Sequence, residues 1–133
     1  MVIQQTVLIV DDTDGFRKLF REYLKNLENC RLLEVRDGQQ AWDLLLREKI
    51  DVVLADISMP KLDGFALLKK IRENPVTSIL YVIMITARTS IGYSREEVLR
   101  QGGDAFFLKP VIRQDLLDQV VLGLRMTGLK RLQ

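Results

Sequence analysis

Short apolar segments alternate five times with amphipathic segments along the chain, and this alternation constrains the fold more than any other feature. The apolar segments are rich in β-branched residues, which predicts buried strands over residues 6–10, 32–35, 51–55, 79–85 and 105–108. Apolar residues at helical spacing predict helices over 16–27, 41–45, 65–71 and 116–124, and a capping sequence at 94–97 predicts another that ends at the glycines 102–103. Five strand–helix units predict an α/β fold whose parallel sheet has helices on both faces and right-handed crossovers.

Composition excludes several classes of protein. The chain has no histidine and a single cysteine, Cys30, so a histidine triad, a histidine metal site, an internal disulfide and a thiolate zinc site are excluded. Twenty basic and 18 acidic residues leave a net charge of +2, which is too small to argue for direct contact with nucleic acid. No run approaches 18 apolar residues and residues 1–5 do not resemble a signal peptide, so we expect a cytoplasmic protein that contacts no membrane.

Charged and hydroxyl side chains stand where four of the five predicted strands end. Asp11 and Asp12 follow the first strand, Asp56 the third, Thr86 the fourth and Lys109 the fifth. Taken singly, these are ordinary residues: a helix cap, a loop acid, a strand-end hydroxyl, a surface lysine. Ligands of open parallel sheets bind outside the carboxyl ends of the strands, so the joint pattern predicts one shared site.

Three carboxylates at one sheet edge repel one another. At about 5 Å and an effective dielectric near 20, each pair costs roughly 3 kcal/mol. A hard divalent cation with oxygen ligands relieves this repulsion, and Mg²⁺ is the first choice. Lys109 can neutralise a further charge. The sequence therefore predicts a Mg²⁺ site beside an ammonium group.

The segments around these residues, in this order and spacing, resemble the receiver domain of bacterial two-component response regulators, of the chemotaxis-regulator type. The resemblance runs from about Thr6 to Leu124, and the segments that carry it are 7–12, 56–60 with Asp63-Gly64, Thr86-Ala87 and Lys109-Pro110. It implies a flavodoxin-like (βα)5 fold, a five-stranded parallel doubly wound sheet with strand order 2-1-3-4-5. Residues 1–133 are then a single receiver domain, with its core at about 6–124 and a tail or linker stub at 125–133.

The resemblance also implies roles for the residues at the sheet edge. Asp56 corresponds to the phosphoacceptor. Asp12 and Asp56 correspond to direct Mg²⁺ ligands, with the Ser58 carbonyl as a third and Asp11 acting mainly through water. Lys109 corresponds to the lysine that pairs with a phosphoryl oxygen.

A second group of residues corresponds to the family's switch. Thr86 is similar to the switch hydroxyl and Phe106 to the switch aromatic, and Lys109-Pro110 matches the family's cis peptide. Phosphorylation is then expected to remodel the face formed by helix 4, strand 5 and helix 5, through which a homodimer is possible. The implied partner is a sensor histidine kinase or a phosphotransfer protein, which supplies the histidine that this chain lacks.

The chain is thus interpreted as a phosphoacceptor switch and not as an enzyme with a turnover substrate. A haloacid dehalogenase-type phosphatase would need a second Asp two residues after Asp56, where Ser58 stands. A flavin-binding flavodoxin relative would need a hydroxyl-rich phosphate loop, whereas the acidic segment 11–14 would repel a phosphate. A degenerate receiver used only for protein contacts is disfavoured by the intact set of site residues.

The sequence departs from the family pattern in a few places. The interval from Thr86 to Lys109 is one residue longer than the commonest spacing, and we expect the extra residue within 88–93, the segment predicted to be the most mobile. The usual acidic pair before the switch aromatic is Asp104-Ala105 here, and Phe106 has no phenol hydroxyl. Ser58 and Arg88 stand at positions where the family tunes dephosphorylation. These departures bear on phosphoryl lifetime and partner choice.

Overall fold

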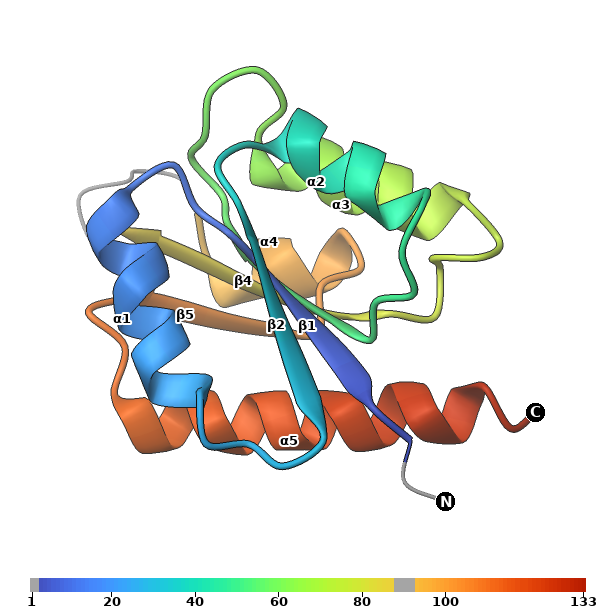
Figure 1. The fold of residues 1–133 in the computed structure, drawn as a ribbon. Helices are drawn as coiled ribbons and strands as arrows, with labels where there is room; N and C mark the ends of the chain where they lie inside the picture. The colour runs from blue at the N-terminus through green and yellow to red at the C-terminus, as the bar shows by residue number, and fades with distance from the viewer. Residues whose placement is uncertain (1–2, 88–92) are drawn as a thin grey trace.

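Five strands form one parallel sheet in the order β2-β1-β3-β4-β5 (Figure 1). The structure is a computed structural model that describes residues 3–87 and 93–133. The strands are β1 (Gln5–Val10), β2 (Cys30–Val35), β3 (Val52–Asp56), β4 (Tyr81–Ala87) and β5 (Ala105–Lys109). The predicted α/β class, parallel pairing and strand order are confirmed.

Helices cover both faces of the sheet, as predicted. One face carries α1 (Asp14–Leu24) and α5 (Arg113–Lys130); the other carries α2 (Gly38–Leu45), α3 (Gly64–Glu73) and α4 (Arg95–Arg100) (Figure 1). Successive residues of a strand point to opposite faces, so the core has two halves. Val7 and Ile9 of β1 pack toward α1 and α5, whereas Leu8 and Val10 pack toward α2 and α3.

Side-chain caps fix the starts of the helices that follow β3 and β4. Asp63 accepts a hydrogen bond from the Ala66 N–H (2.8 Å) at the start of α3. Ser94 accepts one from the Glu97 N–H (3.2 Å), so α4 begins at Arg95 as its capping sequence predicts. These caps fix the first turns of α3 and α4 at the carboxyl edge of the sheet.

The fourth strand begins at Tyr81, two residues later than the apolar run predicts. Residues 74–80 form turns instead, in which Ser78 N–H donates to the Asn74 carbonyl (2.8 Å) and Leu80 N–H to the Thr77 carbonyl (3.0 Å). The Arg72 side chain also donates to the Leu80 carbonyl (2.6 Å). Hydrophobicity alone could not separate Ile79 and Leu80, the apolar end of this turn, from the strand that follows.

The last helix continues to Lys130, beyond the apolar stripe that ends at Leu124. Contacts with the residues that precede β3 hold its C-terminal end. Arg131 forms an ion pair with the buried Asp51 and donates to the Ile50 carbonyl (2.7 Å). The Thr127 hydroxyl donates to the Asp51 carbonyl (2.8 Å). Most of the expected tail at 125–133 is therefore helix that packs on the domain.

Candidate functional site

Three carboxylates meet at the carboxyl edge of the sheet. Asp11 follows β1, Asp12 is the next residue, and Asp56 is the last residue of β3. One carboxylate oxygen from each lies within 4.8 Å of the others. Asp11 and Asp56 are buried and Asp12 is exposed, so the cluster has an inner pair and an outer member that faces solvent.

The ammonium of Lys109, at the end of β5, lies between the two buried carboxylates. Its Nζ is 2.9 Å from Asp11 Oδ2 and 2.9 Å from Asp56 Oδ2. The Lys109 side chain is only 6% exposed, and its Nζ also lies 4.0 Å from the centroid of the Phe16 ring. The lysine is therefore held from three sides, and the Lys109–Pro110 peptide that follows it is cis.

The pKa values of Asp56 and Lys109 are both raised, but for different physical reasons. Burial raises the pKa of Asp56 above its usual value, and the nearby charge of Asp11 adds to this, although Lys109 and the Ser58 N–H act in the opposite sense. Burial would lower the pKa of Lys109, but hydrogen bonds and charge attraction to both aspartates raise it. Lys109 faces two carboxylates, whereas Asp56 faces one ammonium and a second carboxylate, so the charged form of the lysine is stabilised more than the charged form of Asp56.

The loop after β3 approaches the Asp56 carboxylate closely. Ser58 N–H donates to Asp56 Oδ1 (3.0 Å), and Gly64 N–H donates to the Ile57 carbonyl (2.8 Å). A Cβ at position 64 would lie 2.6 Å from Ile57 Cα and 2.7 Å from the Asp56 carbonyl oxygen. Only glycine permits this approach, which explains Asp63-Gly64 in the motif.

The predicted switch residues are both buried next to this site. Thr86, the penultimate residue of β4, is 0% exposed, and its Oγ1 has no hydrogen-bond partner among the residues that the structure describes. Phe106 on β5 is 8% exposed and belongs to the core half that includes Met84 and Val98. Its carbonyl accepts a hydrogen bond from Arg95 at the start of α4 (3.4 Å). Of the segment expected to hold the extra residue, 88–92 lies outside the described residues.

The chemistry of the cluster fits a hard divalent cation. Oxygen ligands are what Mg²⁺ prefers, and the site offers three carboxylates. Asp11 Oδ2 is buried, and the Lys109 ammonium at 2.9 Å is its one partner within the described part of the chain. Asp11 Oδ1 accepts the Thr13 N–H (2.9 Å). A buried carboxylate oxygen with unused acceptor capacity is consistent with a cation or its bound water at this point.

Sequence reasoning missed the part that Phe16 plays in this site. The residue belongs to the apolar stripe of α1, and that spacing predicts only packing. Its contact with Lys109 joins residues 93 positions apart and depends on the approach angle of α1. No local signal in the sequence could have revealed it.

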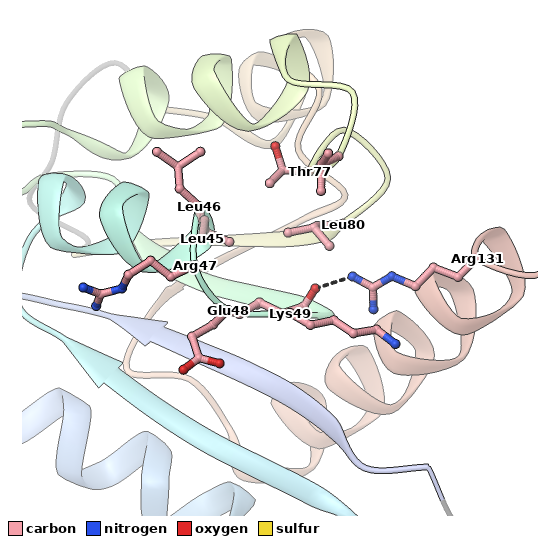
Figure 2. Close-up of a pocket in the computed structure, with 10 residues that line it drawn as sticks. Leu45, Leu46, Arg47, Glu48, Lys49, Thr77, Leu80 and Arg131 are labelled. Atoms are coloured by element: carbon pink, nitrogen blue, oxygen red, sulfur yellow. Dashed lines mark hydrogen bonds between the residues drawn. The ribbon is translucent and has the colours of Figure 1, made fainter.

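A pocket of about 330 Å³ lies at the opposite edge of the sheet (Figure 2). Its lining comes from the end of α2, the connections that precede β3 and β4, and Arg131. In Figure 2 the Arg131 guanidinium points to the backbone beside Lys49, with Leu45 and Leu80 above it. None of the predicted site residues lines this pocket, so it is separate from the acidic cluster.

A model of the response regulator receiver domain matches residues 7–121. The chain belongs to the response regulator receiver domain family. Among curated relatives, the transcriptional regulatory protein SrrA of Staphylococcus aureus is 33% identical over 121 residues, which are 91% of this chain and 48% of SrrA. The receiver domain therefore spans about half the length of the curated relatives it matches.

Solved structures agree with the family assignment. The signal receiver domain of a putative Luxo repressor protein from Vibrio parahaemolyticus is 26% identical, with a TM-score of 0.87 over 98% of this chain and 97% of that one. The Vibrio cholerae chemotaxis protein CheY4 is 22% identical, with a TM-score of 0.79 over 90% of this chain and 98% of that one, and supports the fold alone. The flavodoxin-like receiver fold is thus shown.

Membership gives the chain a coarse function. It is the receiver domain of a two-component response regulator, from a family of phosphoacceptor switches that work with histidine kinase or phosphotransfer partners. Receiver domains bind Mg²⁺ at an acidic pocket, and this domain has a cluster of three aspartates, two of them buried. No helix among the described residues is long and apolar enough to cross a membrane.

Proposed function

We propose that this receiver domain is a cytoplasmic phosphorylation switch whose phosphoacceptor is Asp56. The observation that carries the proposal is the single ammonium of Lys109 at 2.9 Å from both Asp11 and Asp56, inside a cluster of three carboxylates. A structural ion pair needs one carboxylate, and a surplus of buried negative charge is costly. The extra negative charge of this cluster would help to bind a divalent cation, which in turn would help to bind a phosphoryl group. Residues 1–133 form one such domain in this proposal.

The transfer proceeds by attack of an Asp56 carboxylate oxygen on the phosphorus of a phosphohistidine. The oxygen–phosphorus bond forms, the nitrogen–phosphorus bond breaks, and its electron pair stays on the imidazole of the partner kinase or phosphotransfer protein. Lys109, already beside Asp56 Oδ2, neutralises charge on the arriving phosphoryl oxygens. Asp12, Asp56 and the Ser58 carbonyl would hold Mg²⁺ directly and Asp11 through water, and the ion would supply further charge neutralisation there.

The same phosphoryl group operates the switch. It adds about −1.5 to −2 charges and three acceptor oxygens, and the buried Thr86 Oγ1 is a donor with no partner among the described residues. Movement of Thr86 toward the phosphoryl group changes the packing around Phe106, which responds through packing because it has no hydroxyl. The Arg95 hydrogen bond to the Phe106 carbonyl carries the change to α4. The α4–β5–α5 face is thus the surface proposed to engage a partner or a second copy.

Mass spectrometry of the intact protein after incubation with Mg²⁺ and acetyl phosphate tests the assignment. We expect a single phosphoryl adduct on the wild type and none on Asp56→Asn. Asp63→Asn is the matched control, because Asp63 is an acid of the same loop that caps α3 instead of facing Lys109. It should keep the adduct. An adduct that persists in Asp56→Asn would refute the proposal.

A further inference from the structure

The face of an aromatic ring closes one side of the Lys109 ammonium. The Nζ atom lies 4.0 Å from the centroid of the Phe16 ring and 2.9 Å from each of two carboxylate oxygens. An ammonium has three donors, and the carboxylates of Asp11 and Asp56 account for two. The Phe16 ring is therefore a third contact of the Lys109 ammonium, whose side chain is only 6% exposed.

Phe16 is held in place by contacts that do not involve the lysine. It lies in the first turn of α1, packs on the Phe20 ring with 6.0 Å between centroids, and contacts the core half between α1 and α5. The neighbouring Arg17 donates to the Asp11 carbonyl (2.6 Å), and Tyr23 further along the helix donates to the Val111 carbonyl (3.1 Å). The position of the Phe16 ring is therefore set by the core, and Lys109 packs against it.

An aromatic face does two things for an ammonium. Its negative quadrupole attracts the cation, and the attraction strengthens when water is excluded. Its bulk also occupies a position from which water could otherwise solvate Lys109. An aliphatic side chain of similar size would fill the space but would not attract the charge. The ring therefore favours the one Lys109 conformation in which Nζ reaches both Asp11 and Asp56.

We propose that Phe16 is a positioning residue that holds the Lys109 ammonium in place for phosphoryl transfer to Asp56. The inference rests on the proposed function and adds to it a residue outside the strand-end motifs. Phe16 acts through Lys109 and contacts neither the acceptor oxygen nor the phosphoryl group. The preference for an aromatic ring at this position is then electrostatic, and not only a matter of core volume.

Three variants separate this role from packing. Phe16→Leu keeps an apolar side chain but removes the ring, and Phe16→Tyr restores the ring. Trp42→Leu is the control, because it removes the ring of α2 that lies over a different lysine, Lys70, away from the site. The rate of Asp56 phosphorylation is measured with acetyl phosphate at saturating Mg²⁺. We expect Phe16→Leu to be slower by about tenfold, within the range that a desolvated cation–π contact spans. Phe16→Tyr and Trp42→Leu should retain most of the wild-type rate.

Proton NMR of Lys109 tests in solution whether the Phe16 ring lies over the ammonium. The ring current of Phe16 should shift the methylene protons next to Nζ upfield in the wild type and in Phe16→Tyr. The shift should be lost in Phe16→Leu and kept in Trp42→Leu. Thermal unfolding of each variant shows that the domain is folded at the assay temperature.

The outcomes are distinguishable. An unchanged rate in Phe16→Leu, or an equal loss in Trp42→Leu, overturns the positioning role while the proposed function stands. Failure of Phe16→Tyr to restore the rate overturns it as well, because the ring is then not what matters. If the wild type itself takes no phosphoryl group on Asp56, the proposed function fails, and the inference that rests on it fails too.

Discussion

Replacing Lys109 by methionine should strongly destabilise the metal-free domain. Methionine is similar in length and fits the apolar surroundings of the lysine stem, so the change removes mainly the charge. It leaves two buried carboxylates, Asp11 and Asp56, whose side chains are 2% and 6% exposed. The perturbation therefore measures how far the site depends on a cation.

The magnitude follows from the geometry. At 2.9 Å and an effective dielectric near 20, each Lys109–carboxylate contact is worth about 6 kcal/mol before the cost of desolvation. Desolvation cancels much of this, and removal of one partner from a buried pair typically costs about 3–5 kcal/mol. For a chain of this size that corresponds to a fall in Tm of about 10–15 °C. Lys25→Met is the matched control, because Lys25 pairs with Glu22 at an exposed position and should cost under about 1 kcal/mol.

Urea unfolding followed by circular dichroism at pH 7 in EDTA measures the loss. The double variant Lys109→Met with Asp56→Asn should recover a large part of it, because one of the stranded charges is gone. Mg²⁺ should stabilise Lys109→Met more than the wild type, since the ion replaces the missing positive charge. If Lys109→Met loses no more stability than Lys25→Met, or if the second substitution recovers nothing, the electrostatic account of the site is wrong.

Three further substitutions address other parts of the molecule. Asp56→Asn should raise the metal-free unfolding free energy at pH 7. The pKa of Asp56 is raised in the folded state, so the stability that its protonated form contributes is present at acid pH and is lost as pH rises through that pKa. In urea titrations the extra stability of Asp56→Asn should therefore vanish near pH 3. Arg72→Met should cost about 3 kcal/mol in urea unfolding, because Arg72 donates to three carbonyls and to Asp104. Thr86→Ala should leave stability within about 1 kcal/mol and keep phosphorylation of Asp56, yet lose most of the amide NMR shift at Phe106 on adding beryllofluoride; equal shifts in both proteins would contradict the coupling.

The order and type of the elements could be predicted because each depends on local pattern. Apolar runs predicted the strands, helical spacing predicted α1, and the capping sequence at Ser94 predicted the start of α4. The start of β4 was misplaced by two residues because Ile79 and Leu80, at the end of the preceding turn, are as apolar as the strand. The length of α5 was underestimated for another reason: its last turns are held by Arg131 and Asp51, which are 80 residues apart in sequence.

The membership of the site could be predicted, but its internal arrangement could not. The rule that strand ends meet at one edge brought Asp11, Asp56 and Lys109 together, and the structure places them in contact. In the structure one ammonium pairs with both inner carboxylates, and Asp12 faces solvent. This arrangement depends on side-chain conformations, which the spacing of residues in the sequence does not encode. The Phe16 ring over Lys109 depends in addition on how α1 packs against the core.

From the charge balance of the site, we expect phosphorylation to depend on a divalent cation. Three carboxylates and one ammonium give the metal-free cluster a formal charge of −2. A phosphoryl group on Asp56 carries about −2 in place of the single carboxylate charge, which takes the cluster to about −3, and a divalent cation returns it to about −1. Monovalent salt at matched ionic strength should not replace Mg²⁺, because a diffuse screening atmosphere cannot enter a site whose Asp11 and Asp56 side chains are 2% and 6% exposed. Phosphorylation of Asp56 at full rate in potassium chloride and EDTA would contradict this argument.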